Sequence, residues 1–157
     1  MDGRDGRAYA PLTSNRILII DDEPVNIALL KAMLVNVADE VCEVLDSNQA
    51  VQAFKDFAPD LVLLDLHMPQ PDGLEILRQL RSGRDRVGFP PVIVLTESER
   101  GTAKNSALML GADDFLTKPL DRHEVVLRVR NHLRTRHLLE EVQRSSGWFT
   151  KVEEQPQ

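Results

Sequence analysis

Three short runs of apolar residues, each leading into a polar residue, dominate the pattern of the chain. They cover residues 16–20, 61–64 and 92–95, and they are followed by Asp21, Asp65 and Thr96. Continuous apolar runs of this length are typical of strands that are buried on both faces of a sheet. Two weaker strands are expected at residues 41–45 and 114–116.

Apolar residues at helical spacing fill the segments between these runs. The spacing predicts five helices, whose apolar positions are Ile27, Leu30, Leu34 and Val37; Val51, Phe54 and Phe57; Leu74, Leu77 and Leu80; Ala103, Ala107 and Leu110; and Val126, Val129 and Leu133. Pro24 suits the first turn of a helix, and Gly111 suits a helix end. Asp121, with Glu124 three residues later, predicts where the last helix begins.

The alternation of five strands with five helices predicts an α/β fold. We expect a five-stranded, doubly wound parallel sheet with strand order 2-1-3-4-5, the flavodoxin-like (βα)5 arrangement. In such sheets the functional cleft lies beyond the carboxyl ends of the strands, where the strand order reverses. The expected domain covers residues 15–135, between a flexible leader at 1–14 and a helical extension or linker with a disordered end at 136–157.

Composition excludes several classes of function. A net charge of −6 argues against a general surface for nucleic acid, because such a surface needs basic residues. The single cysteine, Cys42, excludes an internal disulfide and a cysteine zinc site, and its strand-like setting suggests a buried, inert thiol. No apolar stretch is long enough to span a membrane or to act as a signal peptide, so a cytoplasmic protein without membrane contact is expected.

Acidic residues end the first and third strands. Asp21, Asp22 and Asp65 would therefore converge, and packed carboxylates repel one another unless a cation neutralises them. Mg²⁺ or Mn²⁺ suits such oxygen ligands, whereas a dinucleotide would need a glycine-rich turn that this chain lacks. Thr96 and Lys118 end two further strands, and they add a hydroxyl and an ammonium group to the same cleft. Together these are the groups that phosphoryl transfer requires, with Asp65 as the nucleophile.

The full set of motifs resembles the response-regulator receiver domain of two-component signalling. The resemblance rests on residues at four strand ends, in order along the chain: Asp21 and Asp22; Asp65 with Met68, Pro69 and Gly73; Thr96; and Phe115 with Lys118 and Pro119. It covers roughly residues 15–135. Any one of these motifs is weak, but the ordered set is specific.

The resemblance implies a role for each matched residue. Asp65 would be the phosphoacceptor, and Asp21 and Asp22 would hold the cation together with Asp65 and the backbone carbonyl of His67. Thr96 and Lys118 would bind the phosphoryl oxygens.

Phe115 would be a switch residue that turns inward as Thr96 moves toward the phosphoryl group. The donor would be a histidine kinase or a histidine phosphotransfer protein. The surface formed by the helix over 103–110, the strand over 114–116 and the last helix would change partner, and a homodimer could form through it. The domain would be no enzyme beyond assisting its own phosphorylation and dephosphorylation.

Several alternatives stay open at the level of sequence. Thr96 could be a simple strand residue and Phe115 a core residue. A metal-dependent aspartyl-phosphate phosphatase is the alternative function, although His67 stands where such enzymes carry a second acid. Glu97 departs from the small residue usual after the threonine, and we expect it to slow phosphotransfer or dephosphorylation.

The C-terminal part of the chain has two interpretations. Residues 128–143 resemble linkers that join receivers to HD-GYP phosphodiesterase or diguanylate cyclase domains, and a stand-alone receiver is the alternative. His123, His132 and His137 fall in or beyond the last helix, where a solvated helix face explains them.

Overall fold

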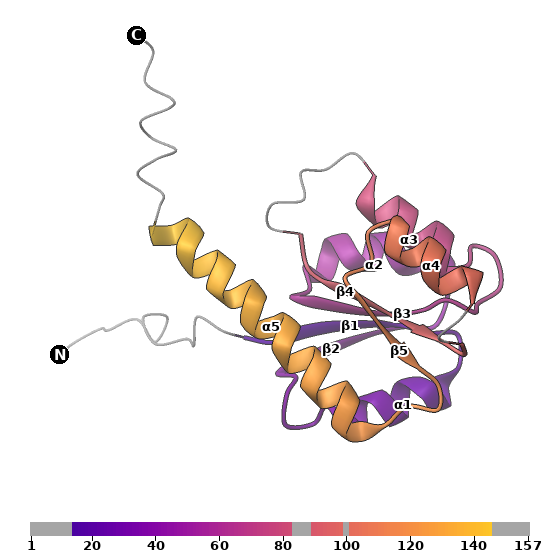
Figure 1. Ribbon diagram of the computed structural model, residues 1–157, viewed down its shortest axis with the longest axis horizontal. Helices are drawn as coiled ribbons and strands as arrows, with labels where there is room; N and C mark the ends of the chain where they lie inside the picture. Colours follow the sequence, from indigo (N-terminus) through magenta and orange to yellow (C-terminus); the bar gives the residue numbers. More distant parts are fainter. Residues whose placement is uncertain (1–13, 83–88, 99–100, 146–157) are drawn as a thin grey trace, which may run out of the picture.

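The computed structural model describes residues 14–82, 89–98 and 101–145, and these form one α/β domain (Figure 1). Five parallel strands alternate with the helices: β1 (Arg16–Ile20), β2 (Glu40–Val44), β3 (Leu61–Asp65), β4 (Val92–Thr96) and β5 (Asp114–Thr117). Their order in the sheet is β2-β1-β3-β4-β5, which confirms the predicted topology. The connecting helices are α1 (Pro24–Met33), α2 (Ala50–Phe57) after a short 3₁₀ turn (Ser47–Gln49), α3 (Gly73–Arg81), α4 (Thr102–Met109) and α5 (Arg122–Ser145).

The helices cover the sheet from both sides, with α2, α3 and α4 on one face and α1 and α5 on the other (Figure 1). The buried residues accordingly form two clusters, one on each side of the sheet. Alternate residues of β1 serve the two sides, because Leu18 and Ile20 join the cluster beneath α2 and α3 whereas Ile17 and Ile19 join the one beneath α1 and α5. All residues of β3 and β4 are buried. This confirms the sequence interpretation of unalternated apolar runs as central strands.

The structure corrects the predicted helix faces at two places. On α5 the fully buried residue of the first turn is Val125, and Val126 is only partly buried. On α3 the innermost residues include Ile76, whereas Leu74 is partly buried. Both errors have one cause, since neighbouring apolar residues allow two stripes of almost equal quality and only the packing decides between them.

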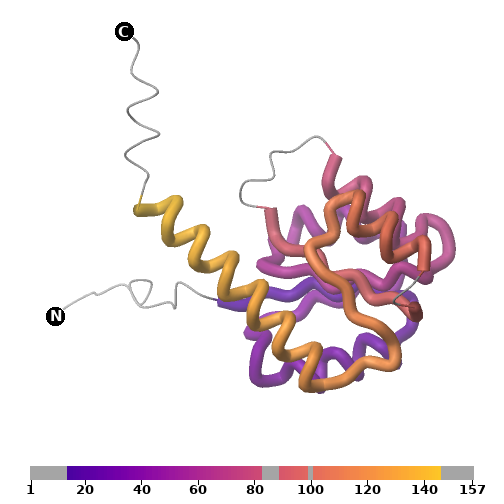
Figure 2. The backbone as a smooth tube through the Cα atoms, viewed as in Figure 1, coloured from indigo at the N-terminus to yellow at the C-terminus, as the bar shows by residue number. Residues whose placement is uncertain are grey.

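Helix α5 is much longer than the sheet it covers and projects beyond it (Figures 1 and 2). It runs without interruption through the predicted domain boundary at residue 135 to Ser145. Beyond that boundary Arg136 Nε lies 3.5 Å from an oxygen of Asp60, and His137 Nε2 lies 2.9 Å from the side-chain oxygen of Asn15. These contacts tie the helix to the end of the sheet at which β1 and β3 begin. Of the predicted leader, residues 1–13 lie outside the described residues, as does the expected disordered end over 146–157.

Two further sequence expectations concern Cys42 and the membrane. Cys42 lies in β2 as expected, but it is half-buried because β2 is an edge strand. Burial raises the pKa of its thiol, and neighbouring Glu43 acts in the same direction. Within the described ranges, no helix has the length and apolar character needed to cross a membrane.

Candidate phosphoacceptor site

Three carboxylates meet at the carboxyl ends of β1 and β3. Asp21 follows β1 directly, and Asp65 is the last residue of β3. The two strands pair in parallel with Ile20 opposite Leu64, so their ends lie side by side. One carboxylate oxygen from each of Asp21, Asp22 and Asp65 lies within 4.8 Å of the others. Asp21 is fully buried and Asp65 is 2% exposed, so these charges are largely withdrawn from water.

The acidic cluster fits a hard divalent cation. Oδ2 of Asp21 is buried and accepts no hydrogen bond from the described residues, which is costly for a carboxylate without a partner. Burial raises the pKa of Asp65, the charge of Asp21 raises it further, and the backbone N–H of His67 and the ammonium of Lys118 oppose this only in part. Oxygen ligands of this kind suit Mg²⁺, or Mn²⁺. No second cluster of three such residues occurs in the described part of the chain.

Lys118 and Thr96 reach the same cleft from β5 and β4. Lys118 Nζ lies 3.3 Å from Oδ1 of Asp65, and its backbone N–H donates to the carbonyl of Thr96 at 2.8 Å. The Thr96 hydroxyl lies 3.4 Å from both the backbone N–H and the carbonyl of Ser98, so it is engaged with the loop after β4. The structure therefore brings Lys118 into direct contact with Asp65. Thr96, at the end of the neighbouring strand β4, instead contacts the loop that follows that strand.

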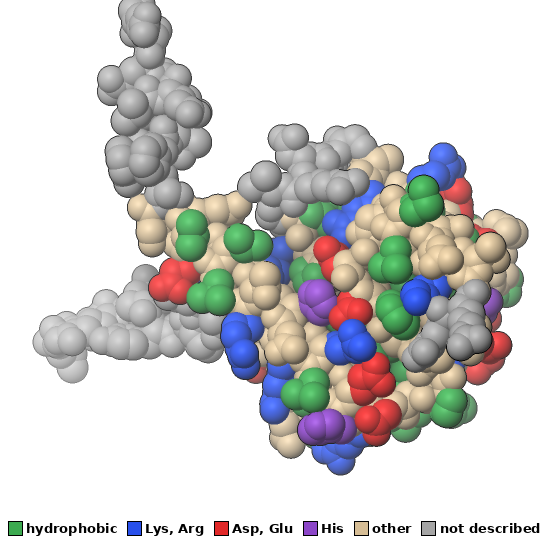
Figure 3. Space-filling view, in the orientation of Figure 1, with side chains coloured by type: hydrophobic (Ala, Val, Ile, Leu, Met, Phe, Trp, Pro, Cys, Tyr) green, Lys and Arg blue, Asp and Glu red, His purple; other side chains and the backbone are tan. Residues whose placement is uncertain are grey.

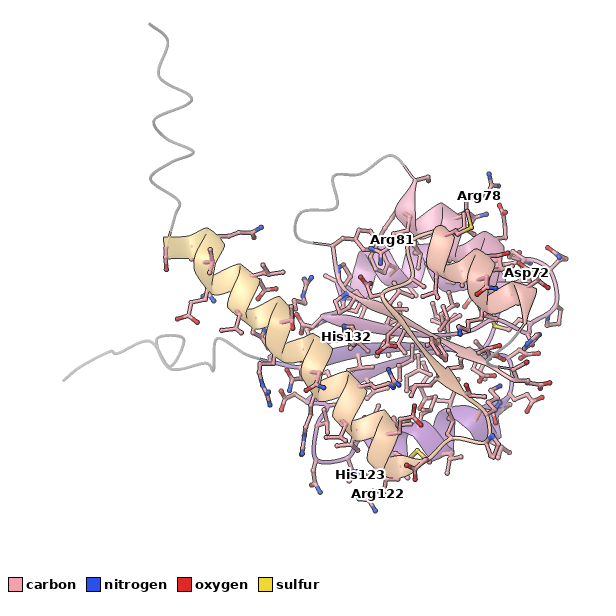
Figure 4. All side chains as sticks on the ribbon, in the orientation of Figure 1. Asp72, Arg78, Arg81, Arg122, His123 and His132 are labelled. Atoms are coloured by element: carbon pink, nitrogen blue, oxygen red, sulfur yellow. The ribbon has the colours of Figure 1, made fainter. Side chains whose placement is uncertain are left out.

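The loop after β3 is shaped around Asp65. The backbone N–H of His67 donates to Asp65 Oδ1 at 3.2 Å, while the His67 side chain is exposed. The N–H of Gly73 donates to the carbonyl of Leu66 at 3.3 Å. A Cβ atom on Gly73 would lie 2.4 Å from the carbonyl oxygen of Asp65, so only glycine allows this close approach. Asp72 caps α3 directly before it, where its side chain accepts from the Glu75 N–H (Figure 4).

Phe115, the predicted switch residue, is half-buried in β5 and packs against the buried cluster beneath α2 and α3. Two cations lie over its ring: Lys104 Nζ is 4.2 Å from the ring centre and the Arg128 guanidinium carbon is 5.9 Å away. These residues come from α4 and α5, so the ring touches every element of the surface that sequence analysis assigned to signalling.

Asp114 is a residue of this surface that sequence analysis did not single out. Its carboxylate accepts from Arg128 Nη1 at 2.9 Å and lies 3.0 Å from Nε2 of His132. His132 is labelled on α5 in Figure 4, and Figure 3 shows acidic, basic and histidine side chains gathered on this face of the molecule. Burial alone would raise the pKa of Asp114, but hydrogen bonds from His132, the Phe115 N–H and Arg128 outweigh it and lower that pKa.

The structure thereby corrects the interpretation of the histidines. His132 and His137 are half-buried; His132 contacts Asp114 of β5, and His137 contacts Asn15, which directly precedes β1. Of the three histidines of α5, His123 alone is exposed. Helical periodicity could not reveal this, because the partners Asp114 and Asn15 lie outside the helix.

The raised pKa of Asp65 gives a pH-dependent stability without metal. In chelator, the unfolded chain releases the Asp65 proton at a lower pH than the folded protein does, so stability falls as pH rises from the unfolded pKa through the higher folded one. We expect Asp65→Asn to remove this loss and to be more stable than wild type at neutral pH. Urea unfolding in chelator from acid to neutral pH measures it, and a constant difference between the two proteins over that range would contradict it.

Comparison with known proteins agrees with this geometry. The family model described as response regulator receiver domain matches residues 17–130. Transcriptional regulatory protein TrcR of Mycobacterium tuberculosis is 36% identical over 125 residues, which make up 80% of this chain and 48% of that protein. The chain spans about half the length of the curated relatives it matches.

Two solved structures share the fold and part of the sequence. A putative response regulator from Chloroflexus aurantiacus superposes with a TM-score of 0.70 at 28% identity, over 77% of this chain and 98% of that one. The receiver domain of sensor histidine kinase PA1611 from Pseudomonas aeruginosa, with a magnesium ion coordinated in its active site cleft, has a TM-score of 0.68 at 29% identity, over 76% and 98% of the two chains. From the family match and these relatives, we conclude that the chain belongs to the response regulator receiver domain family.

Proposed function

We propose that the protein is a phosphoacceptor signalling switch of a two-component system, phosphorylated on Asp65 by a histidine kinase or a histidine phosphotransfer protein. The observation that carries this proposal is the setting of the Asp65 carboxylate. This carboxylate is buried. The carboxylates of Asp21 and Asp22, which suit a cation, lie close to it, and the ammonium nitrogen of Lys118 lies 3.3 Å from it. The magnesium ion in the active site cleft of the PA1611 receiver supports the same arrangement here.

The proposed reaction transfers one phosphoryl group. A carboxylate oxygen of Asp65 attacks the phosphorus of a phosphohistidine, the N–P bond breaks, and an acyl phosphate forms on Asp65. Asp21, Asp22, Asp65 and the carbonyl of His67 would hold Mg²⁺ or Mn²⁺, which supplies positive charge against the phosphoryl oxygens. Lys118 Nζ already lies 3.3 Å from the nucleophile and would bind a phosphoryl oxygen.

The readout of phosphorylation runs through Thr96 and Phe115. The Thr96 hydroxyl leaves Ser98 and donates to the phosphoryl group, and the ring of Phe115 moves into the vacated space. Because this ring contacts Lys104 on α4 and Arg128 on α5, its movement alters the surface of α4, β5 and α5. We propose this surface as the one that changes partner, and as the one through which a homodimer would form.

The observations favour a switch over a phosphatase. Two residues after Asp65, where aspartyl-phosphate phosphatases carry a second acid, His67 exposes an imidazole to solvent. Accepting a phosphoryl group needs no general acid beside the leaving group, whereas rapid turnover of phosphomonoesters would.

Phosphorylation of Asp65 can be tested with acetyl phosphate and Mg²⁺, using intact-protein mass spectrometry as the readout. Wild type is expected to gain the mass of one phosphoryl group and to lose it on standing once the acetyl phosphate has been removed. Asp65→Asn should show no gain, and Asp56→Asn, which changes an exposed carboxylate on α2, should behave as wild type. A wild-type protein that gains no mass, or an Asp65→Asn variant that gains as much, would overturn the proposal. Steady hydrolysis of a phosphomonoester would favour the phosphatase.

Glu97 is expected to slow phosphate chemistry at the site. Its exposed carboxylate follows Thr96 directly and repels both phosphodonors and attacking hydroxide. A charge exposed to water changes the energy of a neighbouring charged group by on the order of 1 kcal/mol. Glu97→Ala should therefore raise the rate of phosphorylation or of dephosphorylation about fivefold. Glu97→Gln separates charge from size, and the effect of charge should shrink at high salt. Equal rates for wild type and Glu97→Ala would rule out this role.

A further inference from the structure

The two oxygens of the Asp21 carboxylate are in different surroundings. Oδ1 accepts the backbone N–H of Glu23 at 2.9 Å and the side-chain N–H of Asn26 at 3.4 Å. Oδ2 is buried and has no hydrogen-bond partner among the described residues. A carboxylate held by two donors on one oxygen has a fixed orientation, and here the oxygen left over is available to the acidic cluster.

Asn26 reaches Asp21 from the first turn of α1. Its Nδ2 also lies 3.3 Å from Oε2 of Glu23, so one amide nitrogen contacts two carboxylates. An amide nitrogen carries two hydrogens, which matches two acceptors. The contact with Glu23 holds a further carboxylate at the start of α1, so that this group is tied to Asn26.

Helix capping does not account for Asn26. A capping side chain accepts hydrogen bonds from free backbone N–H groups, whereas Asn26 donates through its amide nitrogen. The residue before the helix, Glu23, makes no side-chain cap either. Within a helix asparagine is less favourable than leucine or alanine, so its presence costs local stability. The hydrogen bond that its amide donates to Asp21 explains why asparagine occupies this position.

We propose that Asn26 is a positioning residue for the divalent cation site: its amide orients the Asp21 carboxylate so that Oδ2 faces the cation. This inference rests on the proposed cation-dependent function, and it concerns a residue that makes no direct contact with the ion. Partners of this kind fix the direction of a ligand's lone pairs, and their loss typically weakens metal binding about 10- to 100-fold.

Calorimetric titration of the metal-free protein with Mg²⁺ tests the proposal. Asn26→Leu and Asn26→Ala both remove the amide and both favour helix, so α1 should persist, as circular dichroism would show. We expect each to weaken Mg²⁺ binding about 10-fold. Asn105→Leu makes the same exchange at an exposed position of α4 and should bind Mg²⁺ as wild type does.

A double-mutant cycle shows whether Asn26 acts through Asp21. In an Asp21→Asn background the carboxylate to be oriented is gone, so Asn26→Leu should have little further effect on Mg²⁺ affinity. The proposal is overturned if folded Asn26→Leu and Asn26→Ala bind Mg²⁺ within about twofold of wild type, if Asn105→Leu weakens binding as much, or if the effects simply add in the cycle. If wild type itself neither binds Mg²⁺ nor accepts a phosphoryl group, the proposed function fails instead.

Discussion

Replacing Gly73 with alanine is expected to lower the free energy of unfolding by about 3 kcal/mol, because the new methyl group would overlap backbone atoms. A Cβ there would lie 2.4 Å from the carbonyl oxygen of Asp65 and 2.6 Å from the Cα of Leu66. Neither atom belongs to a flexible side chain, so the loop after β3 must move. The loss corresponds to a fall of roughly 10 °C in the melting temperature.

The same movement of the loop should also disturb the cation site. A Cβ on Gly73 would meet the backbone of Asp65, the proposed phosphoacceptor, so its displacement should shift the Asp65 carboxylate relative to Lys118 and the acidic cluster. We therefore expect Gly73→Ala to weaken Mg²⁺ binding as well as stability, measured by calorimetry and by urea unfolding. Gly101→Ala is the matched control, because a Cβ on Gly101 would meet only ordinary contacts, the nearest at 3.7 Å. Equal losses for the two variants would show that steric overlap at Gly73 is not the cause.

The role of Gly73 illustrates how far sequence alone reaches. The ordered motifs include this glycine, but no pattern states that it contacts Asp65, because the contact joins the end of a strand to the start of the next helix. The three central strands were predictable because unalternated apolar runs have few other interpretations. Their alternation with helices indicated a parallel sheet, and the chain length suited the doubly wound order 2-1-3-4-5. The position of the acids then followed from the parallel topology.

The unpredicted features depend on partners distant in sequence or on a choice between equivalent local patterns. Asp114 was only a strand residue until folding placed Arg128 and His132 over it, 14 and 18 residues further along the chain. Val125 and Val126 are alike in type, and only packing against β3 and α1 selects Val125. Asn26 lies five residues from Asp21, yet the sequence does not reveal that its amide and the Glu23 N–H donate to the same oxygen of Asp21, Oδ1.

Replacing Lys118 with methionine is expected to change phosphorylation and metal binding in opposite directions. The ammonium lies 3.3 Å from Asp65 Oδ1, and 21% of the Lys118 side chain is exposed against 3% of the Asp65 side chain, so it neutralises the charge of a buried carboxylate. Its loss would remove the proposed donor to the phosphoryl oxygens, and phosphorylation by acetyl phosphate should slow on the order of 100-fold. Removing a positive charge also relieves repulsion of a divalent cation, so Mg²⁺ affinity should rise about fivefold.

The opposite signs separate an electrostatic role for Lys118 from a structural one. A distorted site would bind Mg²⁺ more weakly and accept a phosphoryl group more slowly, so the Mg²⁺ affinity and the phosphorylation rate would fall together. Lys31→Met is the matched control, since Lys31 is an exposed lysine of α1 paired with Glu43. It should leave both quantities unchanged, because its charge is already compensated outside the site. If Lys118→Met accepts a phosphoryl group at the wild-type rate, the ammonium does not stabilise the transferring group, and that charge would have to come from the cation proposed to bind the three aspartates.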